Sequence, residues 1–359
     1  MKLALIGRPL SGKTTLASLL SGQPYDPAGT FQAGGRPRLV TVKVPDARVE
    51  GLSAHFKPKK TTFATIDLFD TASLSTAPEA RDGNRQILAA VREADAVLVV
   101  LGAHAVSAPP GSAEWIGALK AEMEDLRTEF LVSDLDVIEK RIERLKVELK
   151  RPKPAGDPDK REMEILEMFA KALGEGKPIA SVPLPHREDQ KLVRGFRFFT
   201  EKPALPILNV GDGEAGRAAE IAAAFGGGAV ALCARLELEL SQMSAEEAKE
   251  FLAGYGVTSL VAPTLPATSY RLLGLHSFLT SGEDECRAWT IAVGDDVVTA
   301  AGKIHTDLAK GFISAEVVSY EDWHTLGGMK EARAKGKFRV EGRTYVVKDG
   351  DIINIRFNV

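Results

Sequence analysis

Residues 7–14 constrain the fold of this chain more than any other stretch, because they match the phosphate-binding pattern G-x-x-x-x-G-K-[ST]. The apolar run 2–6 before them predicts a buried strand, and Leu16, Leu19 and Leu20 begin a helical face after them. In this context the glycines let backbone N–H groups turn towards phosphate oxygens, and the new helix adds its positive end. A Gly-rich turn with an accidental lysine is the weaker interpretation. The stretch therefore predicts that the chain binds a nucleoside triphosphate.

The chemistry of this loop assigns roles to individual residues. Lys13 is expected on the β- and γ-phosphates, and the Thr14 hydroxyl is expected to bind Mg²⁺. Asp70 is the second candidate magnesium ligand, because it follows a predicted strand at 64–69, where such folds keep an acidic residue. A simple cap of a turn is the alternative role for Asp70. The loop residues expected to contact nucleotide are Gly7, Arg8, Pro9, Leu10, Ser11, Gly12, Lys13, Thr14 and Thr15.

The bulk composition excludes several other classes of protein. A chain of 359 residues is long enough for two or three domains, and a formal net charge of −3 means that any contact with nucleic acid needs a local basic patch. Two cysteines, Cys233 and Cys286, are too few for a disulfide framework or a zinc site and indicate a reducing, cytoplasmic setting. The N-terminus has no signal-peptide pattern, and no apolar run approaches the roughly 20 residues that span a bilayer. We expect no membrane association.

Strands and helices alternate along much of the chain, which predicts an α/β fold with a mostly parallel sheet wrapped on both sides. One helix is expected at 84–94 and another is expected to end near residue 200, whereas the Pro- and Gly-rich segment 23–38 is expected to be a surface loop. Pro206 indicates that its strand lies at an edge or starts irregularly. The other strands of this sheet are expected at 39–44, 64–69, 96–101, 204–210 and 229–233.

Residues 113–188 predict a helical insertion into this nucleotide domain. Apolar residues at 131, 135, 138, 142, 145 and 149 are spaced 4-3-4-3-4, which is a seam for packing another helix. Ser133 and Asp136 offer a possible cap within the run, and a second helix is expected from Asp157-Pro158 to about 173. The pattern predicts an antiparallel, coiled-coil hairpin, to which no chemistry is assigned.

The last part of the chain predicts a small β-grasp domain. Strands are expected at 289–293, 315–318, 338–340, 344–347 and 352–357, around a helix at 300–308. The expected domains are the nucleotide-binding parts 1–112 and 189–275, the hairpin 113–188, and the β-grasp domain 276–359.

With these motifs in hand, the chain resembles the Obg-like ATPase family, the YchF group of translation-factor-related P-loop NTPases. The resemblance covers nearly the whole length and is most specific in the tail, at 288–290, 302–307, 310–313 and 350–359, which is similar to the family's TGS domain. Residues 44–48, Arg141 and 192–195 add to it. The resemblance implies Mg²⁺ dependence, a preference for ATP over GTP, and binding to the ribosome or ribosomal RNA. We expect such a partner to contact the TGS-like domain and the helical hairpin.

Base recognition departs from both known patterns. A guanine site uses Asn-Lys-x-Asp and relatives have Asn-x-x-Glu, whereas this chain has Asn209-Val210-Gly211-Asp212. Val210 argues against guanine, and Asp212 stands where a guanine-reading Asp would stand. The resemblance favours ATP, so we expect ATP to be bound at least as well as GTP, with GTP as the open alternative. The expected base pocket consists of Asn209, Val210, Asp212, Cys233, Ala234 and Arg235.

The switching half of the site also departs from the family. Ser73 stands where relatives have the glycine of Asp-x-x-Gly, Leu74 follows it, and Gly34 stands where a magnesium-binding Thr is expected, with Thr30 nearby. His104 is near, but not aligned with, the family's histidine. We therefore expect slow Mg²⁺-dependent hydrolysis, as an ATPase or GTPase, and assign no catalytic residue. The alternatives are a nucleotide-dependent binding module without turnover and a small-molecule kinase, which has no need of the β-grasp tail.

Overall fold

The computed structural model describes residues 1–24, 31–32, 36–71, 73, 81–150 and 157–358. The chain forms two compact units. The first unit comprises Met1–Val40 and Asp67–Ala262, and the second comprises Thr41–Ile66 and Pro263–Val359.

The first unit is built on a seven-stranded sheet of order β2-β3-β5-β1-β6-β7-β8. β1 pairs in parallel with both β5 and β6, and β6, β7 and β8 continue the parallel order, whereas β2 pairs antiparallel with β3. β2 lies inside segment 23–38, which is therefore not wholly the loop that its composition predicts. The strands span Lys2–Ile6 (β1), Phe31–Gln32 (β2), Arg36–Lys43 (β3), Thr65–Asp70 (β5), Ala96–Leu101 (β6), Ala204–Asn209 (β7) and Val230–Leu232 (β8).

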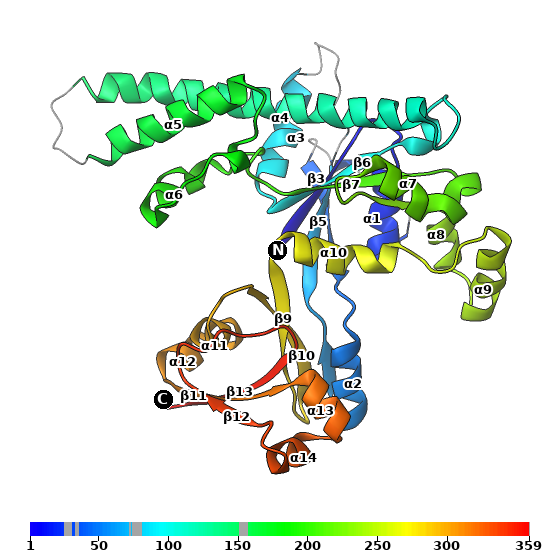
Figure 1. Ribbon diagram of the computed structural model, residues 1–359, viewed down its shortest axis with the longest axis vertical. Helices are drawn as coiled ribbons and strands as arrows, with labels where there is room; N and C mark the ends of the chain where they lie inside the picture. Colours follow the sequence, from blue (N-terminus) through cyan, green and yellow to red (C-terminus); the bar gives the residue numbers. More distant parts are fainter. Residues whose placement is uncertain (25–30, 33–35, 72, 74–80, 151–156, 359) are drawn as a thin grey trace. The chain divides into compact units, whose positions relative to one another are not determined.

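Helices cover both faces of this sheet (Figure 1). α4 contacts β6 and α7, while α1 contacts β1 and α8. Every residue of β6 is buried, as expected of a central parallel strand. The predicted α/β class and mostly parallel sheet are thus confirmed. The covering helices are α1 Lys13–Ser21, α3 Arg81–Arg92, α4 Ala113–Glu148, α7 Ala218–Phe225, α8 Ala234–Leu240 and α9 Ala245–Gly254.

β7 lies inside the sheet, so the first of the two alternatives expected from Pro206, an edge strand, is wrong. Pro206 is opposite Val99 of β6, on one side of β7. On the other side, pairing with β8 begins only at Ile207. A proline is tolerated here because its missing N–H stands just outside the second ladder.

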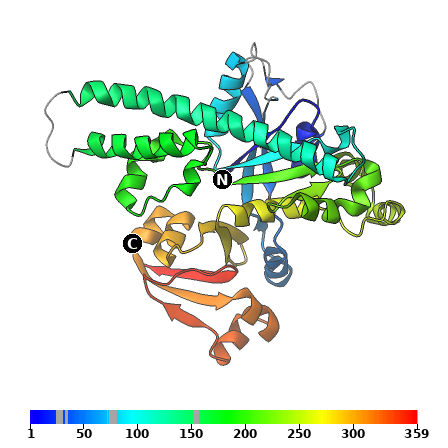
Figure 2. The same cartoon turned by 45° about the horizontal axis from the view of Figure 1, so that its top comes forward.

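The helical hairpin is present and consists of α4 and α5 Pro158–Gly174, which lie side by side in both views (Figures 1 and 2). Their seam buries residues at the predicted spacing, including Ile138, Ile142 and Leu145 against Leu166 and Phe169. Asp157 caps α5 through the backbone N–H of Asp159, with Pro158 at the first helical position, as predicted.

Two features of this region differ from expectation. α4 runs unbroken through Ser133, and its first half packs Trp115, Leu119 and Phe130 into the core of the sheet rather than into the hairpin. The helix expected to reach residue 200 ends earlier, as α6 Arg187–Val193.

The second unit holds a six-stranded sheet of order β12-β11-β13-β9-β10-β4. Sequence reasoning did not identify β9 or β4 as members of it, and residues 344–347 contribute only a bridge between Val346 and Asp296. The strands span Lys60–Thr62 (β4), Leu275–Thr280 (β9), Glu285–Ala292 (β10), Phe312–Ser319 (β11), Arg339–Glu341 (β12) and Asp351–Phe357 (β13), and the helices are α2 Ala47–Phe56, α10 Leu265–Leu272, α11 Val297–Ile304, α12 Thr306–Lys310, α13 Tyr320–Leu326 and α14 Met329–Ala334.

Residues 41–66 belong to this second unit, although their position in the sequence placed them in the nucleotide domain. β4 pairs in parallel with β10, and α2 contacts the same strand. Arg48 also forms an ion pair with Asp349 at 3.0 Å. These contacts join residues far apart in the chain, which local sequence patterns cannot reveal. In the part of the chain that the structure describes, no helix is both long enough and apolar enough to cross a membrane.

Candidate functional site

The phosphate loop connects β1 to α1 with the backbone geometry that its two glycines allow. Gly12 stands at the N-terminus of α1 with φ 97°, and a Cβ there would lie 2.1 Å from the Asn209 side-chain nitrogen. A Cβ on Gly7 would lie 2.3 Å from the Val100 carbonyl oxygen. Any larger residue at either position therefore collides with its neighbours, which explains why both are glycine.

Lys13 is buried under this loop, and its ammonium uses all three of its donors. It donates to the carbonyl oxygens of Gly7 at 3.1 Å and Arg8 at 2.8 Å, and to the Ser73 hydroxyl at 3.0 Å. Burial lowers the pKa of Lys13 to about 8, and the negative charges of Asp70 and Glu122 oppose that effect. The charge of Lys13 is thus held at the loop by carbonyl dipoles and nearby carboxylates.

Asp70 ends β5 beside Lys13 and is fully buried. In the described part of the chain, neither of its carboxylate oxygens has a well-aligned hydrogen-bond donor. Burial raises the pKa of Asp70, and the Thr14 hydroxyl, Lys13 and Arg38 oppose that rise. A buried carboxylate with open oxygens next to a threonine hydroxyl is a donor set that fits Mg²⁺, which binds oxygen ligands and shares them with phosphates. No group of three or more His, Cys, Asp or Glu residues suited to a metal ion occurs among the described residues.

Asn209 connects the phosphate loop to the opposite wall of the site. Its side-chain nitrogen donates to the Ser11 carbonyl oxygen at 2.9 Å, and its side-chain oxygen accepts from the backbone N–H of Ala234 at 3.0 Å. Both groups are buried. The predicted base-pocket residues Asn209 and Ala234 therefore bind each other and the loop, which fixes the spacing between the two.

A cavity of about 540 Å³ opens between these walls and is large enough for part of a nucleotide. It brings together predicted residues from three separate stretches of sequence. His104, Gly211 and Leu238 also line it and were not predicted; the His104 ring nitrogen Nδ1 lies 3.1 Å from the Asn209 carbonyl oxygen. Leu238 belongs to no motif, and it lines the cavity because one turn of α8 places it beside Arg235. The predicted residues that line the cavity are Leu10, Gly12, Thr15, Asn209, Val210, Asp212, Cys233 and Arg235.

Asp212, the residue in the guanine-reading position, is already engaged. Its carboxylate accepts from the Cys233 thiol at 3.1 Å and forms an ion pair with Arg235. Burial raises the pKa of Asp212, but the hydrogen bonds from Cys233 and Arg235 and the charge of Arg235 outweigh it, so the net pKa is lowered. A guanine base would therefore have to compete with these partners for the Asp212 carboxylate.

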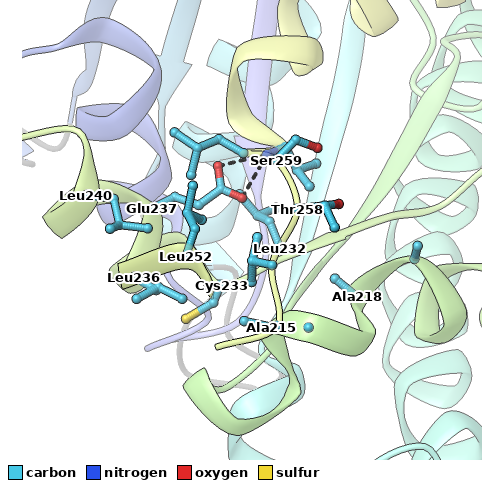
Figure 3. Close-up of a pocket in the computed structure, with 16 residues that line it drawn as sticks. Ala215, Ala218, Leu232, Cys233, Leu236, Glu237, Leu240, Leu252, Thr258 and Ser259 are labelled. Carbon is cyan, nitrogen blue, oxygen red and sulfur yellow. Dashed lines mark hydrogen bonds between the residues drawn. The ribbon is translucent and has the colours of Figure 1, made fainter. Parts of the chain in front are cut away.

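A second cavity, of about 190 Å³, lies on the other side of Cys233, and both apolar and polar atoms line it (Figure 3). Glu237 lines it, and its carboxylate accepts from the backbone N–H groups of Val261 and Ala262. This carboxylate therefore anchors the segment that leads out of the first unit. Burial raises the pKa of Cys233 to about 11, so the thiol is not a nucleophile at neutral pH.

The residues that depart from the family pattern are only partly described. Ser73 accepts a hydrogen bond from Lys13, whereas Thr30, Gly34 and Leu74 lie outside the described residues. Arg141 forms a two-point ion pair with Glu162 of α5 at 2.7 and 3.0 Å, so it holds the hairpin together.

The chain is similar to known proteins along its whole length. The family model YchF-GTPase_C, described as a protein of unknown function (DUF933), matches residues 275–358. The chain is 34% identical to the ribosome-binding ATPase YchF of Haemophilus influenzae over 365 residues, which cover 100% of this chain and 99% of that relative. It is 33% identical to the ribosome-binding ATPase YchF of Bacillus subtilis, with 99% of this chain and 98% of the relative covered.

A solved structure, that of the Schizosaccharomyces pombe YchF GTPase, resembles this one with a TM-score of 0.80 at 27% identity, and covers 99% of this chain and 97% of the other. Relatives more than 30% identical thus align with the chain from end to end, and the solved fold agrees with its architecture. The chain therefore belongs to the YchF group of Obg-like P-loop NTPases, as a divergent member with a C-terminal TGS-like domain.

Proposed function

We propose that this protein binds ATP with Mg²⁺, hydrolyses it slowly to ADP and phosphate, and associates with the ribosome in the cytoplasm. The observation that carries the proposal is the group formed at the phosphate loop by buried Lys13, buried Asp70 and the half-buried Thr14. Lys13 would bind the β- and γ-phosphates, and Thr14 and Asp70 would hold the magnesium ion. The ion would neutralise charge on the β- and γ-phosphates.

Titration of the purified chain with labelled ATP and GTP, with and without Mg²⁺, tests this function. We expect Mg²⁺-dependent ATP binding and phosphate release below roughly 1 s⁻¹, the lower end of typical enzyme turnover. Slow release is expected because Ser73 occupies a donor of Lys13 and no catalytic glutamine follows it. Tight ATP binding without any phosphate release would instead support the alternative function, a nucleotide-dependent binding module.

Base preference is expected to favour ATP because Asp212 is paired with Arg235. Replacing Arg235 with alanine frees Asp212, so GTP affinity should rise by about threefold or more while ATP affinity changes less, the exposed ion pair being partly screened. Calorimetric titration with both nucleotides measures this ratio. Arg217→Ala, which removes a similar surface ion pair with Glu220, is the control. The preference for ATP would be contradicted if the wild-type chain bound GTP ten times more tightly than ATP and Asp212→Ala abolished that difference.

Ribosome binding is proposed because the relatives from Haemophilus influenzae and Bacillus subtilis are named ribosome-binding ATPases. Lys303, Lys330 and Lys335 are exposed on the second unit. Replacing all three lysines with glutamate should weaken co-sedimentation with ribosomes by at least about tenfold near 0.1 M salt, because contacts to RNA phosphates depend on positive side-chain charges. Charge reversal is preferable to deletion of residues 276–359, which would remove the strand that pairs with β4.

Each of the three substitutions is also made singly and compared with Lys120→Glu. Lys120→Glu makes the same charge change on the half of α4 that packs against the sheet of the first unit. The hairpin is tested in parallel by Lys140→Glu, which lies on α4 beyond that half. Undiminished co-sedimentation of both the triple variant and Lys140→Glu would place the partner surface elsewhere.

A further inference from the structure

Hydrolysis at this site needs a group that orients the attacking water, and the usual one is missing. In GTPases of the Ras kind a glutamine follows the Asp-x-x-Gly motif and holds that water. Here the residue after Ser73 is leucine, which has no hydrogen-bonding group. Given the proposed ATP hydrolysis, on which this inference rests, another side chain has to orient the attacking water.

Helix α4 brings carboxylates to the phosphate loop. Asp125 forms an ion pair with Arg8 of the loop, at 2.5 Å between Nη2 and Oδ2. Glu122 lies three residues earlier in the same helix, and residues at this spacing share one face. The ion pair therefore holds the face that carries Glu122 against the loop.

The Glu122 carboxylate is placed near Lys13 and has one open acceptor. Oε1 is buried and has no hydrogen-bond partner among the residues that the structure describes. Burial raises the pKa of Glu122, while the charges of Arg8 and Lys13 lower it and that of Asp125 raises it further. Conversely, Glu122 helps to keep Lys13 charged, so the two side chains lie within electrostatic reach of each other.

The chemistry of this open acceptor restricts what can fill it. An ionised carboxylate only accepts hydrogen bonds, and a bound triphosphate is an anion that offers it no donor. Direct contact between the two would be repulsive, whereas a water molecule can donate one hydrogen to Glu122 and present its oxygen to the phosphate. A buried polar atom without a partner carries a desolvation cost, which such a water would remove.

We propose that Glu122 holds the water that attacks the γ-phosphate, in the role that glutamine has in GTPases of the Ras kind. The water oxygen forms a bond to the γ-phosphorus as the bond from that phosphorus to the β–γ bridging oxygen breaks. The bond electrons leave with ADP, and the protons of the water pass to the phosphate and to solvent. Glu122 orients the water by accepting one of its hydrogens.

Glu122→Leu keeps about the size of the side chain and removes both its charge and its hydrogen-bond acceptor. We expect kcat for phosphate release to fall by about 10²-fold or more, the range for groups that position or accept a proton in the transition state. ATP affinity should stay the same or increase slightly, because a negative charge near the triphosphate is lost. Glu124→Leu, on the exposed side of α4, is the matched control and should change neither quantity.

A second measurement does not depend on turnover. ADP with aluminium fluoride and Mg²⁺ mimics the transition state together with its in-line water. Glu122→Leu should weaken binding of this complex by at least about tenfold while leaving ADP affinity unchanged, and an unaltered melting temperature would show that the variant folds. Turnover and analogue binding within twofold of the wild type would overturn the role of Glu122 alone. A wild-type chain that binds ATP, releases no phosphate and does not bind the analogue would overturn both hydrolysis and this role.

Discussion

Lys13→Ala is expected to weaken ATP binding by roughly tenfold to a hundredfold. A hydrogen bond from a charged donor contributes about 1.5–3 kcal/mol, and this ammonium is the charged donor of the phosphate loop. In the structure, hydrogen bonds to the carbonyl oxygens of Gly7 and Arg8 hold the Lys13 ammonium under the loop. The side chain is thus already beside the position that the phosphates would take. Titration with labelled ATP in the presence of Mg²⁺ measures the loss.

Two further variants make the result interpretable. Lys13→Met retains the aliphatic stem and loses only the charged head, so it should match the alanine variant in affinity if the ammonium is what matters. Lys120→Ala removes an exposed lysine of α4 and should leave ATP affinity unchanged. Unchanged ATP affinity in folded Lys13→Ala protein would contradict the assignment of the phosphate loop.

Asp134→Ala is expected to destabilise the first unit by about 3–5 kcal/mol, the range for breaking a buried charged pair by removing one partner. Asp134 is fully buried in α4. Its carboxylate accepts from the backbone N–H groups of Phe199 and Thr200 at 3.1 and 2.9 Å, from the Thr200 hydroxyl at 3.0 Å, and from Arg92 at 3.4 Å. Alanine would leave buried donors and the guanidinium of Arg92 without this acceptor.

Urea denaturation followed by circular dichroism measures the loss, and amide hydrogen exchange at Phe199 and Thr200 shows whether it is local. Asp136→Ala is the control: that aspartate lies two positions further along α4, is exposed, and pairs with Lys140 at 2.6 Å. An exposed pair one helical turn apart contributes only about 0.5 kcal/mol. Equal effects of the two substitutions would show that the bonds of Asp134 do not stabilise the unit.

The sequence predicted the parts of the site that depend on neighbouring residues. The glycine spacing of the phosphate loop, the strand before it and the helix after it are local features, because each follows from backbone freedom or apolar periodicity within a few residues. The same holds for the hairpin, where the spacing of Ile138, Ile142 and Leu145 predicts a seam that the structure contains. Asp157 and Pro158 likewise predict where α5 begins.

Contacts between distant residues could not be derived in this way. Residues 60–62 have the composition of a loop, and only pairing with residues 285–287 makes them a strand of the second unit. Pro206 appeared unsuited to an interior strand, and only the short length of β8 makes it acceptable there. Ser133 and Asp136 looked like a helix boundary, yet burial of Asp134 against residues 199–200 accompanies an unbroken helix.

By itself the sequence determined a phosphate-binding loop, an α/β sheet, a helical hairpin and a C-terminal sheet domain, because these depend on short-range backbone geometry and periodicity. Only the tertiary structure decided that Asp212 is paired with Arg235, that Asn209 holds the loop to Ala234, and that the charge of Glu122 acts on Lys13. Each of these relations joins residues that lie between 23 and 198 positions apart in the chain. The energies of these interactions depend on the burial of the groups and on the distance between them, and both are set only when the chain folds.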